Sequence, residues 1–301
     1  MDWLHGLILG IIQGLAEFLP ISSSGHLTIG QELFNVGGEE NLTFDIVVHF
    51  ATVLSTIIVF RKQLKGLVKG FFCRGMNKEK DYIFKIFVSM IPILIVGLLL
   101  KDHVEKLFAT DFIKEHTGNP LLVVGIMLMI TAALLIFSEW STARQNALPT
   151  KQSGGQESAD DLKEEKAPIK YWQAFVVGIA QAIAVFPGLS RSGSTIATGL
   201  LVKVKKSAIA QFSFLMVIIP ILGEAFLSLL KSLAEASNSV AIDGQRTSVL
   251  PLIVGFFAAF ISGLFACRLM VNLVKKVKLN GFAYYCAVVG LLCIVLPYVL
   301  K

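Results

Sequence analysis

The chain has 301 residues, of which 54% are hydrophobic and 16% are charged, with a formal net charge of +6. Soluble domains carry about a quarter charged residues, so this composition excludes an ordinary soluble domain. The mean hydropathy is +0.71, and several apolar runs approach the roughly 20 residues that a helix needs to cross a bilayer. We therefore predict an all-α, polytopic membrane protein. Its basic residues lie in short stretches between apolar runs and form no single face, which argues against a nucleic-acid partner.

Two apolar stretches stop early. Residues 3–21 run into a Pro/Gly/Ser-rich segment at 19–26, and residues 172–190 run into another at 186–193. Irregular backbone inside a membrane is tolerated where protein buries it or where it lines a wet cavity. We therefore predict that both stretches are re-entrant helical elements that enter the membrane and turn back. About six full crossings are expected at 44–60, 82–100, 120–138, 211–230, 250–267 and 282–299.

The loops predict the orientation. Residues 61–80, 201–206 and 268–278 are strongly basic, whereas 101–118 and 231–249 are mixed in charge or nearly neutral. Cytoplasmic loops carry an excess of Lys and Arg, so we place the basic loops inside and both termini outside. The four cysteines show no CxxC spacing and are predicted to be free thiols.

The two ends of the chain resemble each other. A shift of 168 residues places Gln13 on Gln181 without a gap, and it also aligns Phe18/Phe186, Ser22/Ser190, Ser24/Ser192 and Gly25/Gly193. Three crossings separate the copies, so the second copy would be inverted, and such repeats usually place their site between them near the midplane. We predict one membrane domain, 1–301, made of a first inverted repeat, a polar cytoplasmic linker and a second repeat at 1–140, 141–168 and 169–301.

The first polar cluster runs from Gln13 to His26. Gln13 and Glu17 are four residues apart and would share one helix face. A carboxylate inside an apolar run is costly and usually functional, although Glu17 could instead cap a neighbouring backbone. His26 could act as a general base or as a nucleophile. Hydroxyls and backbone N–H groups for an oxyanion would come from Ser22, Ser23, Ser24 and Gly25.

The second cluster is centred on Arg191. A guanidinium matches phosphate oxygens in geometry and stays charged, although an interfacial arginine could also bind lipid headgroups. Because the clusters occupy equivalent positions in the two halves, they could meet. Together they suit phosphoryl transfer, with an activated nucleophile, a stabilising arginine and a carboxylate able to hold Mg²⁺ or Ca²⁺. The small hydroxyl residues around the arginine are Ser190, Ser192 and Thr195.

Three further polar residues have no settled role. Asp45 and His49 lie four residues apart at the head of the 44–60 run. They could line the same cavity, or Asp45 could simply cap its helix. Glu224 follows Pro220 and could support the site or lie near the outer end of its helix.

The two clusters closely resemble the motifs of the undecaprenyl-diphosphatase family, also known as the bacitracin-resistance proteins. The family's first motif resembles (E/Q)xxxE followed by FLPxSSxGH, matched here by Gln13, Glu17 and the run to His26. Its second resembles PGxSRSGxT, matched from Pro187 to Thr195. The resemblance implies hydrolysis of undecaprenyl pyrophosphate to undecaprenyl phosphate and phosphate, which recycles the carrier lipid of peptidoglycan synthesis. It also implies a bacterial inner-membrane location, an outward-facing site and stimulation by a divalent cation.

Carried over residue by residue, the resemblance implies that Glu17, with Gln13, handles metal or proton transfer. It makes Ser23 or His26 the nucleophile or base and leaves open which one attacks. Arg191 would bind phosphate. The residues expected to help it are Ser22, Ser24, Ser190, Ser192 and Thr195.

Two other functions compete with the phosphatase. A polyprenyl-phosphate flippase is the main alternative, because inverted repeats with broken helices are typical of transporters. A non-catalytic lipid-binding scaffold would leave Glu17, His26 and Arg191 without a reason to lie in the membrane. The partners expected are a polyprenyl pyrophosphate lipid and the bilayer, and the sequence leaves the oligomeric state open, a homo-oligomer included.

Overall fold

The computed structural model describes residues 1–36, 39–99, 119–147, 169–186, 188–223, 226–227, 249–276 and 278–299. Within these ranges the chain is helical and contains no strand, which confirms the all-α prediction. The helices are α1 (Trp3–Ala16), α2 (Ser23–Leu33), α3 (Glu39–Val59), α4 (Arg61–Phe72), α5 (Lys78–Leu99), α8 (Pro120–Ala147), α9 (Tyr171–Ile183), α10 (Arg191–Leu201), α11 (Lys206–Met216), α13 (Val249–Lys276) and α14 (Asn280–Val299).

Four described stretches are long and apolar enough to cross a membrane: Pro120–Arg144, Lys206–Gly223, Val249–Val271 and Asn280–Pro297. A fifth is obtained if α3 and α4, which meet at a bend of 76°, count as one broken span. These five coincide with five of the six predicted crossings. The remaining one, 82–100, lies in α5, which is not among these candidates. The chain is thus a polytopic membrane protein by the length and composition of its helices.

Two boundaries differ from the sequence prediction. The basic segment 61–80 is expected as a loop, but the helix α4 forms its first part, from Arg61 to Phe72. Its apolar residues Leu64 and Leu67 pack against the main hydrophobic core, which explains why a charged segment is helical there. The predicted linker 141–168 also begins too early, because α8 continues to Ala147, and 148–168 lies outside the described residues.

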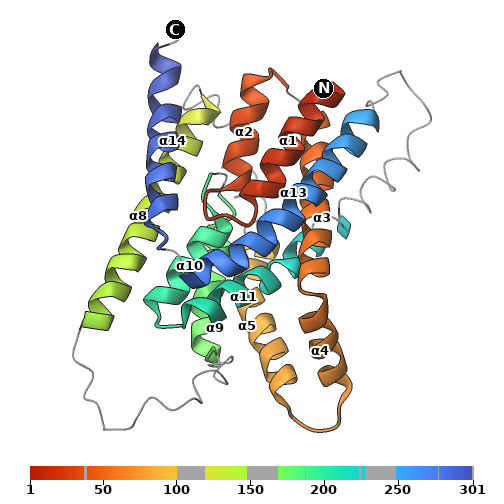
Figure 1. The fold of residues 1–301 in the computed structure, drawn as a ribbon, viewed down its shortest axis with the longest axis vertical. Helices are drawn as coiled ribbons and strands as arrows, with labels where there is room; N and C mark the ends of the chain where they lie inside the picture. Colours follow the sequence, from red (N-terminus) through yellow and green to blue (C-terminus); the bar gives the residue numbers. More distant parts are fainter. Residues whose placement is uncertain are drawn as a thin grey trace.

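Two short hairpins, α1–α2 and α9–α10, enter the molecule from opposite ends (Figure 1). Their helices have only 11 to 14 residues, too few to span a bilayer alone. Each hairpin reverses at its Ser/Gly-rich segment, where the backbone takes positive φ angles of 70° at Ser22 and 91° at Gly188. Both turns lie near the middle of the molecule in this view, as expected for re-entrant elements.

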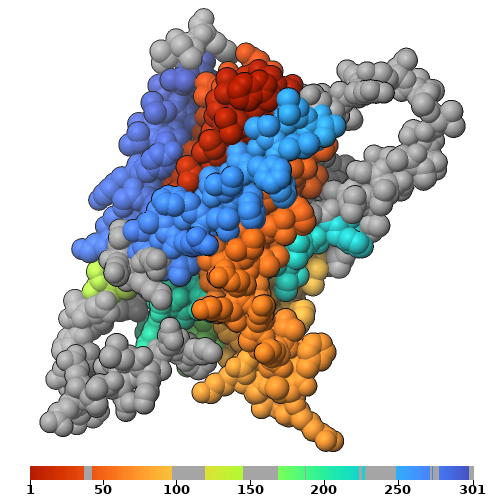
Figure 2. Space-filling model, turned by 45° about the vertical axis from the view of Figure 1, so that its right-hand side comes forward, coloured from red at the N-terminus to blue at the C-terminus, as the bar shows by residue number. Residues whose placement is uncertain are grey.

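Each hairpin is held by a long helix from the other half of the chain. Figure 2 shows α13 lying across α1 and α3, and α9 packs in the same way on α5. The helix backbones approach each other closely at these contacts. A Cβ atom on Gly10 would lie 2.4 Å from the Gly255 carbonyl oxygen, and one on Gly178 would lie 2.3 Å from the Ser89 carbonyl oxygen. Gly10 and Gly178 are equivalent under the shift of 168 residues. Each hairpin thus packs on a helix from the other half of the chain, which agrees with an inverted repeat. The inverted relation between the complete halves stays a prediction.

Candidate active site

The two Ser/Gly-rich turns share one local structure. Ser22 is the N-cap of α2 and accepts a hydrogen bond from the Gly25 N–H at 3.2 Å, while Ser190 caps α10 and accepts one from Gly193 at 3.0 Å. In each turn the capping hydroxyl also lies 3.4 Å from the hydroxyl two residues later. Serine at an N-cap satisfies N–H groups that would otherwise be unpaired. The N-terminal ends of α2 and α10, which attract negative charge, therefore begin at the two motifs.

The two turns contact each other. The Gly188 N–H donates to the Ser24 hydroxyl at 3.4 Å, and the Ser192 hydroxyl donates to the Leu19 carbonyl at 3.1 Å. A Cβ atom on Gly25 would lie 3.1 Å from the Gly188 Cα, so glycine permits this close approach. The structure thus brings together motifs that are separated by 168 positions in the chain.

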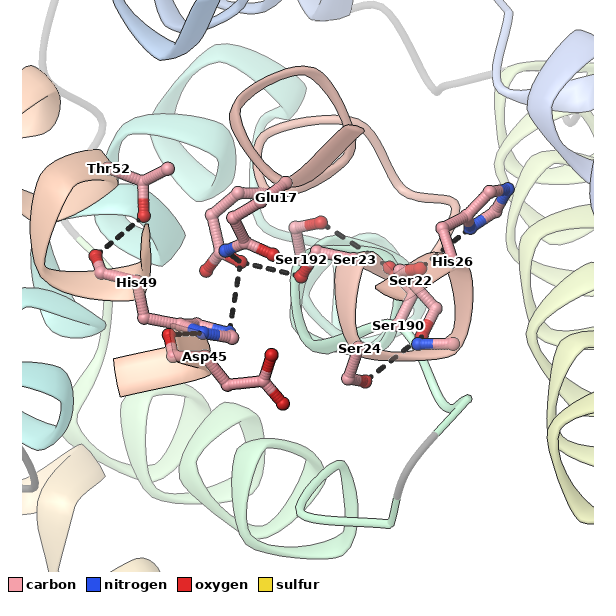
Figure 3. Close-up of polar contacts among 12 residues, drawn as sticks. Glu17, Ser22, Ser23, Ser24, His26, Asp45, His49, Thr52, Ser190 and Ser192 are labelled. Atoms are coloured by element: carbon pink, nitrogen blue, oxygen red, sulfur yellow. Dashed lines mark hydrogen bonds and ion pairs between the residues drawn. The ribbon is translucent and has the colours of Figure 1, made fainter. Parts of the chain in front are cut away.

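Glu17 is the centre of the polar contacts in this region (Figure 3). Its Oε2 atom accepts hydrogen bonds from the Ser23 hydroxyl at 2.6 Å and from the Gln13 amide at 2.9 Å. The His49 Nε2 atom lies 3.7 Å from the same oxygen. Only 9% of the Glu17 side chain is exposed. Of the three consecutive serines 22–24, Ser23 is the one whose hydroxyl contacts this buried carboxylate.

Two adjoining cavities meet at Glu17, Arg191 and Ser192, which line both of them. The first is mostly polar, and the second is more apolar. Glu17 and Arg191 are the only charged residues that line either cavity in the described part of the chain. The hydroxyl residues of the first cavity are Ser22, Ser23, Ser24, Ser190 and Ser192.

Arg191 is the first residue of α10. Its guanidinium takes part in no hydrogen bond or ion pair within the described ranges, so its donors are available to an anion in the cavity. Thr195, one turn later, lines the second cavity only, and its hydroxyl hydrogen-bonds the Ser213 hydroxyl at 2.6 Å. The first cavity therefore combines an arginine fork, serine hydroxyls and two helix N-termini, which are groups that recognise phosphate.

His26 does not lie where the sequence interpretation expected it. Its Nδ1 atom lies 2.8 Å from the Ser22 carbonyl oxygen, and its Nε2 atom lies 2.8 Å from the Tyr285 hydroxyl. The ring stacks on Tyr285 with a centroid distance of 5.5 Å, and it points away from Glu17 (Figure 3). His26 lines neither of these two cavities, and both of its ring nitrogens have hydrogen-bond partners. Ser23, rather than His26, is the residue in contact with the carboxylate.

The remaining sequence candidates are also placed. Asp45 does not cap α3, which begins six residues earlier at Glu39; its Oδ1 atom accepts a hydrogen bond from the Gln31 amide at 2.8 Å. Neither Asp45 nor His49 lines either of these two cavities, but the His49 Nε2 atom lies 3.7 Å from the Glu17 Oε2 atom. In the sequence, the only sign that His49 could lie at the site is its helical spacing from Asp45. Pro187 and Glu224 lie outside the described residues.

A family model described as "Bacitracin resistance protein BacA" matches residues 6–292. The chain belongs to the BacA family. Relatives that carry the name undecaprenyl-diphosphatase include one from Bacteroides fragilis, 51% identical over 295 residues that cover 98% of both chains. One from Parabacteroides distasonis is 51% identical over 294 residues, again 98% of both chains. One from Christiangramia forsetii is 42% identical over 300 residues, 99% of both chains.

The residues around Glu17 supply few ligands for a divalent cation. No group of three or more His, Cys, Asp or Glu side chains that could hold a metal occurs in the described part of the chain. However, the buried Gln13 has an Oε1 atom without a hydrogen-bond partner there, while the Nε2 atom of the same amide donates to the Glu17 carboxylate. Mg²⁺ is usually held by one or two carboxylates together with substrate phosphates. One carboxylate and one amide oxygen fit that mode of binding and do not form a complete cage.

Proposed function

We propose that this BacA-family protein hydrolyses undecaprenyl pyrophosphate to undecaprenyl phosphate and inorganic phosphate, and so recycles a carrier lipid of peptidoglycan synthesis. The observation that supports this most strongly is the contact between Ser23 and Glu17 in a serine-lined cavity that Arg191 also lines. The relatives' names point to the same activity. A lipid pyrophosphate also suits a site inside apolar helices, because its tail can stay in the bilayer.

In this proposal Ser23 is the nucleophile. Glu17 takes the proton of the Ser23 hydroxyl while that oxygen attacks the terminal phosphorus. The bond between the terminal phosphorus and the bridging oxygen breaks, and undecaprenyl phosphate leaves. Glu17 gives that proton to the departing undecaprenyl phosphate and is a free carboxylate again. It next takes a proton from the water that attacks the phosphoserine, and it returns this proton to the Ser23 oxygen as the bond from phosphorus to that oxygen breaks. Inorganic phosphate is the second product.

Arg191 stabilises the charge that develops on the phosphoryl oxygens. Its planar fork can contact two oxygens at once, which a lysine ammonium cannot do in the same way. The N-terminal N–H groups of α2 and α10 add donors from both halves of the chain. Ser22, Ser24, Ser190 and Ser192 complete the phosphate-binding surface of the first cavity, and Thr195 supports it from the second.

A divalent cation, Mg²⁺ or Ca²⁺, fits the same account. Glu17 and Gln13 would hold it together with oxygens of the substrate. When bound, the cation would neutralise negative charge on the pyrophosphate. The chain's own residues still position the serine and receive its proton.

We further propose a plasma-membrane location, with the mouth of the site open to the extracytoplasmic side. The support is the excess of Lys and Arg in 61–80, compared with the mixed charge of 101–118.

The test of the activity is phosphate release from undecaprenyl pyrophosphate by the purified chain in detergent. We expect turnover by the wild type and a loss of about 10²–10⁴-fold in Glu17→Gln, the range for a general base. Glu17→Gln keeps the size of the side chain, so its thermal unfolding should match that of the wild type. No phosphate release by folded wild type, or full activity of Glu17→Gln, would contradict the proposal.

A further inference from the structure

Among the described residues, His49 is the only one outside the α1–α2 hairpin whose side chain makes a hydrogen bond or ion pair with the Glu17 carboxylate. We propose that His49 is a positioning residue, which holds the Glu17 carboxylate against the Ser23 hydroxyl. This rests on the proposed phosphatase function. It adds a residue that the two sequence motifs do not contain, since His49 lies in α3.

The orientation of the imidazole is set by its own helix. The Nδ1 atom lies 2.7 Å from the Asp45 carbonyl oxygen, one turn earlier. A backbone carbonyl can only accept, so Nδ1 carries the proton and donates. This bond fixes the ring and directs Nε2 at Glu17, as a second partner commonly does for functional histidines. The side chain is 18% exposed, so the ring has little freedom to turn.

The helix that carries His49 is in turn tied to the serine motif. The Asp45 carboxylate accepts a hydrogen bond from Gln31, and Gln31 is a buried residue of α2. The helix α2 begins at Ser23. One residue pair thus connects α3 to the nucleophile's helix, while His49 connects α3 to the nucleophile's base.

Glu17 needs a group that fixes its orientation, because both the Arg191 guanidinium and the Ser23 hydroxyl attract its carboxylate. Arg191 lines both cavities with Glu17 and attracts its carboxylate. A carboxylate that turned toward the guanidinium would release the Ser23 hydroxyl. The His49 Nε2 atom is 3.7 Å from Oε2, the same oxygen that accepts from Ser23. Since Nδ1 already carries a proton, Nε2 attracts the carboxylate only as the second N–H of an imidazolium, and the proposal concerns that form of His49. At 3.7 Å the contact is electrostatic rather than a full hydrogen bond, and such contacts often shorten when substrate binds.

The test compares three variants of the full-length protein in detergent, with undecaprenyl pyrophosphate as substrate. His49→Phe keeps a planar ring and removes the nitrogen that faces Glu17. His49→Gln keeps an N–H donor at a similar reach. His5→Gln, in the first turn of α1 beside Asp2, is the matched control, because His5 lies away from the site. Thermal unfolding of each variant reports folding separately from activity.

For His49→Phe we expect kcat to fall by about 100-fold, the cost of misplacing a catalytic group by about 1 Å. The KM should change by less than about threefold, because the phosphate contacts are kept. His49→Gln should recover most of kcat, and His5→Gln should equal the wild type. If His49→Phe unfolds, His49→Leu takes its place in the comparison with His49→Gln.

The contrary outcomes distinguish the role of His49 from the phosphatase function. Unchanged kcat in a folded variant that lacks the nitrogen, a change in KM alone, or no recovery in His49→Gln would overturn the positioning role while the phosphatase function stands. An inactive wild type would overturn the phosphatase function and the role of His49 with it.

Discussion

Alanine substitution of the three consecutive serines should separate chemistry from folding. The Ser23 hydroxyl lies 2.6 Å from the Glu17 carboxylate, and it makes no other hydrogen bond within the described residues. Loss of an activated nucleophile removes the reaction path through it, so Ser23→Ala should lower kcat by about 10³-fold or more. Its unfolding temperature should stay near that of the wild type.

Ser22 has the opposite role. Its hydroxyl caps α2, and loss of an N-cap costs about 1 kcal/mol. The residue also holds a backbone φ of 70°, a conformation that costs of the order of 1–3 kcal/mol in strain. Ser22→Ala keeps that strain and loses the cap, so it should lower stability more than activity. Ser24→Ala removes only two long contacts of 3.4 Å, one with the Gly188 N–H and one with the Ser22 hydroxyl, and should have the smallest effect on both.

The assay measures phosphate release and thermal unfolding for the three variants in one detergent. The expected order of activity is Ser24→Ala, then Ser22→Ala, then Ser23→Ala, whereas Ser22→Ala should be the least stable. Substantial activity in Ser23→Ala would refute the serine mechanism. It would reopen direct attack by water, with Glu17 as the base.

Three other predictions concern packing, orientation and metal. Gly10→Ala and Gly178→Ala should each cost about 1–3 kcal/mol by overpacking the helix contacts, whereas Gly66→Ala, with nothing within 4 Å of its Cβ, should not lower the unfolding temperature. Cys73 is exposed and the other three cysteines are buried, so an impermeant thiol reagent should label the protein only in opened cells; labelling in intact cells would reverse the proposed topology. Removal of divalent cations with EDTA should lower phosphate release and added Mg²⁺ or Ca²⁺ should restore it, and an unchanged rate would remove the proposed cation.

Much of the architecture could be predicted from local patterns. Apolar runs that stop at Ser/Gly-rich segments cannot leave those segments exposed to lipid, so the re-entrant hairpins followed from the sequence. The equivalence of Ser22 with Ser190 then suggested that the turns meet, and they share hydrogen-bond patterns. The roles of the individual site residues stay predictions.

The directions in which individual side chains point could not be predicted from local sequence patterns. The partner of His26 is Tyr285, at the far end of the chain, and no local pattern relates the two. Likewise, the approach of His49 to Glu17 depends on how α3 packs beside the first hairpin. The helix α4 is a different case, because Leu64 and Leu67 have helical spacing that the dense positive charge of the segment obscured.

The central claim is that motifs from the two halves act on one pyrophosphate. The most direct measurement is phosphate release by Arg191→Lys, since Arg191 belongs to the second motif and Ser23 to the first. We expect at least about a 10²-fold loss of kcat/KM, because a lysine keeps the charge but cannot make the two-pronged contact. The folded variant should unfold at the wild-type temperature. Turnover close to that of the wild type would show that Arg191 does not hold the phosphate attacked by Ser23, and would contradict the single-site account.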